Sequence, residues 1–149
     1  MTHESVVWEH VRQVFESVEN HVARGLQRAH GLGLTEYRAL QLLSTAPESE
    51  LRMQELAKQL GLNQSSVTRL VGRLERNGYT IRDVCPNDKR GVFTVITKLG
   101  RQIQVEAGGD YDNFLNAALD EAAHEHKNKA IVKGLRQMVG QEGPSANYY

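Results

Sequence analysis

The sequence predicts a mainly α-helical fold that carries one small β-hairpin. An apolar stripe with helical spacing lies between Asn63, a residue type that caps helix N-termini, and Gly78, a residue type that ends helices; the stripe consists of Val67, Leu70, Val71 and Leu74. Two β-rich runs follow, at residues 79–84 and 92–97, with the polar segment 85–91 between them. Long amphipathic stretches occupy both ends of the chain. A basic helix followed by a hairpin with a basic tip is typical of a winged helix-turn-helix.

Two short helices are predicted before this stripe, and a long one opens the chain. Residues 5–30 are predicted to form an amphipathic helix, because apolar residues recur there at three- and four-residue steps. Thr35 opens a shorter helix that closes before Pro47, and a third helix covers about residues 51–60. Residues 61–63, which include a glycine, link the third helix to the next. Two short helices joined in this way form a helix-turn-helix.

Two more helices are predicted after the hairpin. Thr97 is expected to end the second strand and to cap a long helix. Gly108 and Gly109 interrupt this helix, each at a cost of about 1 kcal/mol relative to alanine, so we expect a bend or a close helix crossing there. Asp120 is predicted to cap the last helix.

The chain has no formal net charge, but its charge is unevenly distributed. It contains 18 Lys or Arg residues and 18 Asp or Glu residues. Residues 52–101 hold ten basic and four acidic side chains, a net charge of +6, so the remainder holds eight basic and fourteen acidic ones, a net charge of −6. A basic middle between acidic ends gives the electrostatic field a direction and favours a DNA-binding surface in the middle of the chain.

We expect a single domain over residues 1–149, because one core suffices for a chain of this length. Residues 34–100 are the predicted winged helix-turn-helix, the DNA-binding region. The flanking segments, 1–33 and 101–141, are predicted to be dimerisation helices. Their apolar stripes exceed what a small body can cover, and such surplus surface closes most simply around a two-fold axis.

The sequence argues against several other classes of protein. No run approaches the roughly 18 consecutive apolar residues of a membrane span, and a single cysteine fits the reducing cytoplasm. No phosphate-binding loop, no nucleophile with a placed base and no metal cluster is recognisable, so neither an enzyme nor a cofactor is expected. The histidines offer no metal site on one helix face, and zinc would need histidines brought together by the fold or by a second subunit.

The polar face of the helix that follows Asn63 supplies candidate DNA contacts. Its first two turns carry the residues expected to meet base edges in the major groove, namely Gln64, Ser65, Ser66, Thr68 and Arg69. Glutamine can pair with adenine and arginine with guanine. Further along, Arg73 and Arg76 are better placed for phosphates. The alternative interpretation is a solvated helix face, on which Ser66 simply helps to cap the helix.

The hairpin tip supplies a second set of candidates. Asn87, Lys89 and Arg90 are expected to reach a phosphate or the adjacent minor groove, which attracts arginine where it is narrow. The alternative is a charged turn that serves solubility. Cys85, which precedes Pro86, is open to two interpretations: a redox switch activated by its basic neighbours, or an ordinary half-buried residue at the end of a strand.

Several of these segments form a combination found together in one family. They are SVTRLVGRLERNGY at 66–79, DKR at 88–90 and ITKLG at 96–100, preceded by LTEY at 34–37 and ELAKQLGL at 55–62. Together they resemble the MarR family of bacterial and archaeal transcriptional regulators. The resemblance covers residues 34–101 position by position, and the flanking helices only in their layout.

The resemblance implies a homodimer that binds a pseudo-palindromic operator in double-stranded DNA and represses transcription. Half-sites about 10 base pairs apart would let both recognition helices face one side of the duplex. The resemblance also implies that a small phenolic or anionic effector enters a cleft between the two regions and releases the DNA. Candidate contacts near this cleft are Trp8, His10, Arg12 and Arg38, although each is also compatible with plain packing or surface exposure.

The resemblance bears on the wing as well. The family pattern implies that Asp88 organises the wing through an ion pair with Arg90 or Arg73. Lys89 stands where a second arginine is common, which keeps the charge but loses bidentate geometry. Some family members respond to oxidation of a cysteine near the N-terminus, whereas the single cysteine here is Cys85. The rival interpretation of the whole chain is a winged-helix adaptor that binds proteins and has no specific DNA binding.

Overall fold

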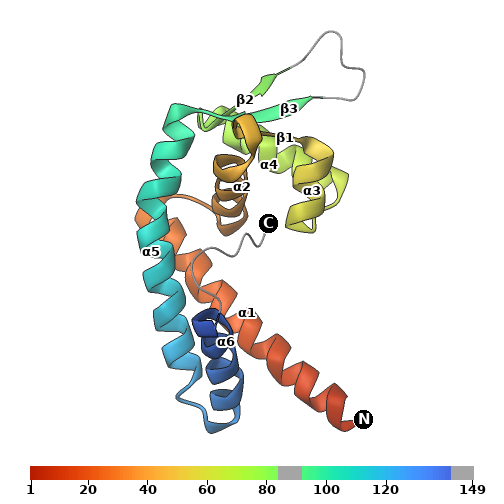
Figure 1. The fold of residues 1–149 in the computed structure, drawn as a ribbon, viewed down its shortest axis with the longest axis vertical. Coiled ribbons are helices and arrows are strands. Elements are labelled where there is room, and N and C mark those ends of the chain that lie inside the picture. The colour runs from red at the N-terminus through yellow and green to blue at the C-terminus, as the bar shows by residue number, and fades with distance from the viewer. Residues whose placement is uncertain (84–91, 142–149) are drawn as a thin grey trace.

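The computed structural model describes residues 1–83 and 92–141. The elements, in chain order, are α1 (His3–His30), α2 (Leu34–Thr45), the 3₁₀ turn η1 (Pro47–Ser49), β1 (Glu50–Arg52), α3 (Met53–Leu60), α4 (Gln64–Arg76), β2 (Thr80–Asp83), β3 (Phe93–Ile96), α5 (Lys98–Ala122), η2 (His126–Asn128) and α6 (Lys129–Gln141). The sheet and α2 to α4 form one end of the molecule, and α1, α5 and α6 extend away from it (Figure 1). The fold is therefore mainly helical with a small sheet, as predicted. Within the described ranges, no helix has the length and apolar content needed to cross a membrane.

The sheet has three antiparallel strands in the order β1-β3-β2. Strands β2 and β3 are the predicted hairpin, and Thr80 lies opposite Ile96 at its base. The prediction of a helix from residue 51 is wrong: α3 begins only at Met53, and Glu50–Arg52 pair with β3 as a third strand. A strand of three residues is too short to show an alternating apolar pattern. Strand β1 can therefore be recognised only from its pairing with β3, far along the chain.

The long helix α5 begins at the predicted cap. The hydroxyl of Thr97 accepts the backbone N–H of Gly100 at 3.0 Å, which caps the helix. The same hydroxyl donates to the backbone carbonyl of Gly78 at 2.6 Å, and Gly78 lies just before β2. Thr97 therefore joins the base of the hairpin to the start of α5 through one oxygen atom.

Helix α5 is longer and more regular than predicted. Asp120 does not cap the last helix, because α5 continues two residues beyond it. Its carboxylate instead accepts a hydrogen bond from Arg136 of α6 at 2.7 Å. Helix α5 also remains continuous through Gly108 and Gly109. A Cβ on Gly109 would meet no atom within 4 Å, whereas one on Gly108 would lie 3.5 Å from the hydroxyl of Tyr37.

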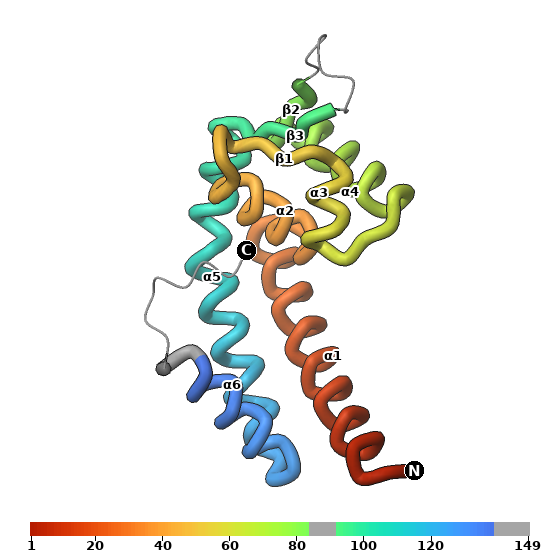
Figure 2. Tube along the Cα trace, turned by 45° about the vertical axis from the view of Figure 1, so that its right-hand side comes forward, coloured from red at the N-terminus to blue at the C-terminus, as the bar shows by residue number. Residues whose placement is uncertain are grey.

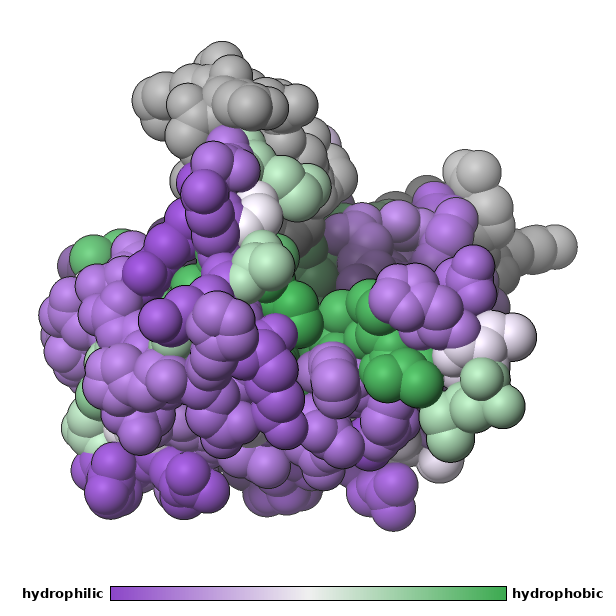
Figure 3. All heavy atoms as spheres, turned by 90° about the horizontal axis from the view of Figure 1, so that it is seen from below, coloured by the Kyte–Doolittle hydropathy of each residue, from purple (hydrophilic) through white to green (hydrophobic). Residues whose placement is uncertain are grey.

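Burial changes along α1. Its later turns pack into the core through Val14, Val18, Val22 and Leu26, which are buried. Its first two turns stay exposed and carry the large apolar side chains Val6, Val7 and Trp8, and Phe15 further along α1 is exposed as well. Helix α1 lies beside α5 near α2 and diverges from it towards the N-terminus (Figures 1 and 2). Seen from that end, apolar side chains gather in a strip within a hydrophilic surface (Figure 3). One copy of the chain thus leaves apolar helix surface uncovered.

A glycine lets α1 and α5 approach closely. A Cβ placed on Gly25 of α1 would lie 2.6 Å from a ring carbon of Phe114 of α5, well inside van der Waals contact. Nearby, Nε2 of His30 lies 2.7 Å from a carboxylate oxygen of Asp110, which also connects α1 to α5. These contacts hold the C-terminal end of α1 against the middle of α5.

We expect Gly25→Ala to destabilise the protein, because the added methyl group meets the ring of Phe114. Overpacking of this kind costs about 1–3 kcal/mol, which exceeds the roughly 1 kcal/mol that alanine gains over glycine within a helix. The measurement is the midpoint of thermal unfolding at one fixed protein concentration.

Gly109→Ala is the matched control on α5, because its new methyl group meets no atom within 4 Å. Its midpoint should stay constant or rise. A rise of equal size in Gly25→Ala would contradict the close crossing of α1 and α5.

Candidate nucleic-acid interface

The turn between α3 and α4 is short and held by backbone and side-chain hydrogen bonds. Gly61 ends α3 with a left-handed backbone (φ 68°), a conformation that a Cβ would strain. Asn63 then caps α4, as predicted: its side-chain oxygen accepts the backbone N–H of Ser66 and the hydroxyl of Ser65, both at 2.9 Å. The first turn of α4 is therefore fixed relative to α3.

Burial decides which face of α4 points outward. The predicted stripe of Val67, Leu70, Val71 and Leu74 is at most 1% exposed. The opposite side carries exposed polar residues, namely Gln64, Ser65, Thr68, Arg69 and Arg76, while Ser66 is half-buried. The structure thus brings most of the predicted recognition residues onto one solvent-facing surface. We call this surface the α4 face, defined by those five exposed residues.

The side chains of the α4 face differ in their local bonds. The Thr68 hydroxyl donates to the carbonyl of Gln64 at 2.8 Å, so its lone pairs remain able to accept. Neither Arg69 nor Arg76 forms an ion pair with any residue in the described part of the chain. Two guanidinium groups on an exposed helix face, without an ion pair to any described carboxylate, suit an anionic partner.

Arg73 is placed differently from its neighbours. Its Nε donates to a carboxylate oxygen of Glu36 at 3.2 Å, and Glu36 belongs to the first turn of α2. The Glu36 side chain is only 13% exposed, so this contact lies against the body of the molecule. Another arginine, Arg82 of β2, donates to Glu75 of α4 at 2.6 Å. Sequence reasoning missed both contacts, since each joins separate elements and only the charge of the residues is visible in the sequence.

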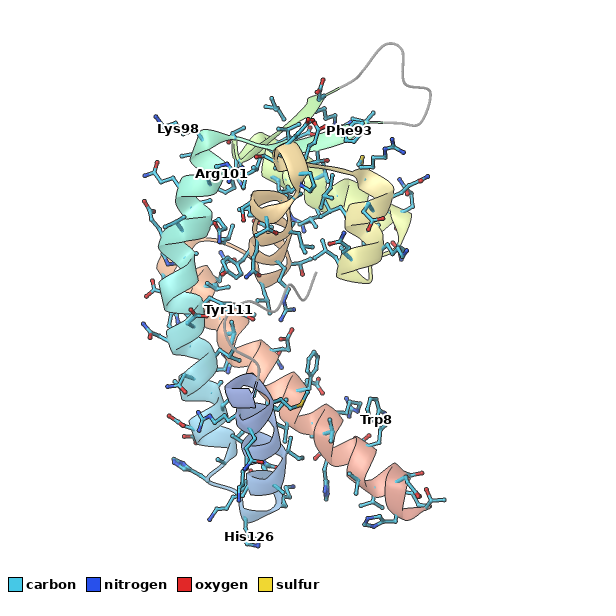
Figure 4. All side chains as sticks on the ribbon, viewed as in Figure 1. Trp8, Phe93, Lys98, Arg101, Tyr111 and His126 are labelled. Atoms are coloured by element: carbon cyan, nitrogen blue, oxygen red, sulfur yellow. The ribbon has the colours of Figure 1, made fainter. Side chains whose placement is uncertain are left out.

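The hairpin is described at its base and not at its tip. The guanidinium of Arg52 lies 5.1 Å from the centre of the Phe93 ring, a cation–π contact that packs β1 on β3. Phe93 is at the sheet end of the molecule (Figure 4). The predicted wing residues lie outside the described residues; these are Asn87, Lys89 and Arg90, together with Asp88 and Cys85. The structure therefore places the strands that would carry a wing.

The four predicted cleft residues are not brought together. Arg38 of α2 forms two hydrogen bonds to Glu19 of α1, at 2.8 and 2.6 Å. Trp8 is 68% exposed and lies on the part of α1 that diverges from α5 (Figure 4). It is eleven residues from Glu19, or about 16 Å along the helix. Arg12 is paired with Glu9 and Glu16 on its own helix, and His10 lies on the same outer stretch of α1.

Arg38 lies in a polar junction between three helices. Tyr37 of α2 stacks on Tyr111 of α5 with ring centres 4.8 Å apart, next to the bidentate pair between Arg38 and Glu19. The hydrogen bonds to Glu19 raise the pKa of Arg38 above its ordinary value, so the guanidinium stays charged. Within the described residues, no group of three or more His, Cys, Asp or Glu side chains is close enough to hold a metal ion. The junction thus places a charged guanidinium, paired with Glu19, beside two stacked aromatic rings.

Comparison with known proteins supports the interpretation of α4 as a DNA-binding helix. The MarR family model matches residues 32–92. The HTH-type transcriptional regulator YkoM of Bacillus subtilis is 36% identical over 90 residues, which are 60% of this chain and 56% of that protein. The chain thus spans about half the length of the curated relatives that it matches.

Two solved structures extend the similarity to the whole fold. Sco3205, a MarR family transcriptional regulator from Streptomyces coelicolor crystallised in complex with DNA, has a TM-score of 0.75 and 29% sequence identity, covering 100% of this chain and 95% of that one. NadR in complex with 4-hydroxyphenylacetate has a TM-score of 0.60 and 26% identity, covering 85% of this chain and 86% of that one. The chain is therefore similar to the MarR family over residues 32–92, and its whole fold is similar to that of solved MarR family transcriptional regulators.

Proposed function

We propose that this protein is a repressor that binds a pseudo-palindromic operator in double-stranded DNA as a homodimer in the cytoplasm. The observation that carries the proposal is the α4 face, a solvent-facing row of polar and cationic side chains on a helix whose opposite side is buried. The DNA complex of the similar protein Sco3205 supports it. Direct reading of base edges requires a helix presented in this way.

Helix α4 and the wing would contact different parts of the DNA. Gln64, Ser65, Ser66, Thr68 and Arg69, in the first turns of α4, would enter the major groove and read bases. Arg76, at the end of α4, would contact a phosphate, which adds affinity without sequence preference. Arg73 is a weaker candidate for a phosphate contact, because Glu36 already holds its Nε. Asn87, Lys89 and Arg90 of the wing would grip the flanking backbone or minor groove, with Asp88 organising them.

The exposed apolar surface of the terminal helices supports dimerisation. Four large apolar side chains in the N-terminal half of α1 are exposed in one copy, namely Val6, Val7, Trp8 and Phe15, as are Leu135 and Met138 of α6. Such surface is costly in water and marks an interface. A two-fold axis through these helices would present two α4 faces to one side of a duplex, with half-sites about 10 base pairs apart.

The junction around Arg38 supports an effector site for a small phenolic or anionic molecule. A carboxylate could compete with Glu19 for the guanidinium of Arg38, and a phenol ring could pack beside the stacked Tyr37 and Tyr111. NadR binds 4-hydroxyphenylacetate, a molecule of this class. Occupation of the junction would loosen the docking of α2 on α1 and lower the affinity for the operator.

Arg69→Ala should remove much of the specific binding, lowering operator affinity about 5- to 150-fold for each half-site, because a bidentate base contact is worth about 1–3 kcal/mol of discrimination. Lys89→Ala should mainly weaken binding to all DNA and lower the slope of log affinity against log salt by about 1. Operator affinities measured over a salt series, for a duplex selected by the wild-type protein from a random library, test both.

Lys127→Ala is the matched control, since it removes a positive charge from an exposed ion pair at η2. Its affinity and salt slope should match those of the wild type. An unchanged operator affinity for Arg69→Ala would refute the role of α4, and a wild-type protein that selects no duplex would favour the protein-binding adaptor.

Phe15→Glu should convert dimer to monomer, because it places a charge within the apolar surface of α1. Phe15 is 62% exposed in one copy of the chain. Ile81→Glu is the control, being the same kind of change at a 56% exposed apolar residue of β2, and it should leave the mass unchanged. The molar mass is read by light scattering coupled to size exclusion. Equal masses for the two variants would count against a dimer built on α1.

A phenolic acid should lower operator affinity more than its neutral analogue, because the guanidinium of Arg38 selects an anion. The probes are 4-hydroxyphenylacetate and its amide, titrated into the protein–operator complex at constant ionic strength. Release by the acid alone supports the site. Equal release by both molecules, or none by a panel of phenolic acids, would argue against an anion site at Arg38.

A further inference from the structure

Three consecutive residues of α2 contact three different helices. Glu36 accepts a hydrogen bond from Arg73 of α4 at 3.2 Å. Tyr37 stacks on Tyr111 of α5 with ring centres 4.8 Å apart. Arg38 donates two hydrogen bonds to Glu19 of α1, at 2.8 and 2.6 Å. Successive side chains on a helix point about 100° apart, so three consecutive residues of one helix can contact three different neighbouring helices.

These three contacts connect α4, through α2, to α1 and α5. Helices α1 and α5 meet at Gly25 and Phe114 and are connected by His30 and Asp110. Four further side chains of α2 are buried in the single core that α2 shares with α1, α3, α4 and α5: Ala39, Leu40, Leu42 and Leu43. Helix α2 therefore lies between α4 and the pair of α1 and α5, and contacts both.

The contacts to α1 and α5 are directional and partly buried. Tyr37 is 3% exposed, and Gly108 of α5 lies opposite its hydroxyl without a side chain between them. The pair of Arg38 and Glu19 is bidentate and partly shielded from water, with side-chain exposures of 36% and 24%, and a bidentate pair fixes orientation as well as distance. The contact to α4 is a single bond between the 13% exposed Glu36 and the 46% exposed Arg73. Arg38 and Tyr37 therefore contribute more to the angle than Glu36 does.

We propose that Glu36, Tyr37 and Arg38, here called the α2 clasp, are positioning residues for DNA recognition. They fix the angle of α4 relative to α1 and α5 without touching DNA. This inference rests on the proposed function as a dimeric DNA-binding protein. In the dimer, α1 and α5 carry the two-fold axis, so the angle held by the clasp sets the separation of the two α4 faces. The clasp thereby determines how strictly the protein measures the spacing between half-sites.

The test is a spacing series on the operator selected by the wild-type protein. Duplexes with the centre shortened or lengthened by one, two and five base pairs, and a duplex with a single half-site, are titrated by fluorescence anisotropy. The proteins are the wild type, Arg38→Gln, Glu36→Gln and the control Lys127→Gln in η2, which breaks an exposed ion pair with Glu125. Thermal unfolding and molar mass are measured for each protein.

The wild type and the control should bind one spacing best and lose affinity steeply on either side. The clasp variants should bind that spacing about 2- to 30-fold more weakly, the range found for residues that act on a distant site. They should also lose most of the preference among spacings, while their affinity for the single half-site stays within about twofold of the wild type.

Clasp variants that keep the steep spacing profile would overturn the inference. An equal loss at every spacing and at the single half-site would overturn it as well, since that pattern indicates general damage to the fold. If Arg38→Gln shows no cooperative unfolding, Arg38→Lys replaces it, because lysine keeps the charge and gives up the bidentate geometry. A wild-type protein without any spacing preference would contradict the proposed dimeric function itself.

Discussion

The orientation of α4 about its own axis depends on the burial of one apolar stripe. Val67, Leu70, Val71 and Leu74 are essentially inaccessible to water, and each buried aliphatic side chain of this size contributes about 1.5–3 kcal/mol. Turning the helix by one residue would expose part of this stripe and bury a charged guanidinium such as that of Arg69. Exposed ion pairs at the same helix are worth about 0–1 kcal/mol. Hydrophobic burial, and not the polar residues themselves, therefore decides which side chains face a partner.

Local signals made much of the fold predictable from sequence. The stripe of α4, its cap Asn63 and the α5 cap Thr97 all act within one turn of the chain, so their patterns are visible in neighbouring residues. The hairpin strands carry enough β-branched residues to be recognised. Strand β1 escaped prediction because three residues have no period and pair with a strand far along the chain. Asp120 was misplaced because an N-capping residue type also occurs inside helices, where it can bind across to another element.

The candidate site, like the fold, could be predicted where it depends on local sequence patterns. The α4 face follows from helical spacing once its buried side is known, and most of the expected residues lie on it. The contacts of Arg73 with Glu36, and of Arg38 with Glu19, were beyond reach, because each joins helices whose packing angle no local pattern specifies. The cleft residues could not be predicted for the same reason: the positions expected to line one cleft are not close together in the folded chain. Charge separation between the middle and the ends of the chain was informative where total charge was not.

The double role of the Thr97 hydroxyl has a mechanical consequence. One oxygen atom binds the carbonyl of Gly78 at the hairpin base and the first turn of α5. Helix α5 has 25 residues and so measures about 37 Å from end to end. Because the helix is long, a small rotation at its start moves its far end by a large distance: a tilt of about 5° at Thr97 displaces the far end by roughly 3 Å. A small change of angle at the hairpin end of α5 would thus move its far end by about the length of a hydrogen bond. A movement at the far end would in turn change the angle at the hairpin.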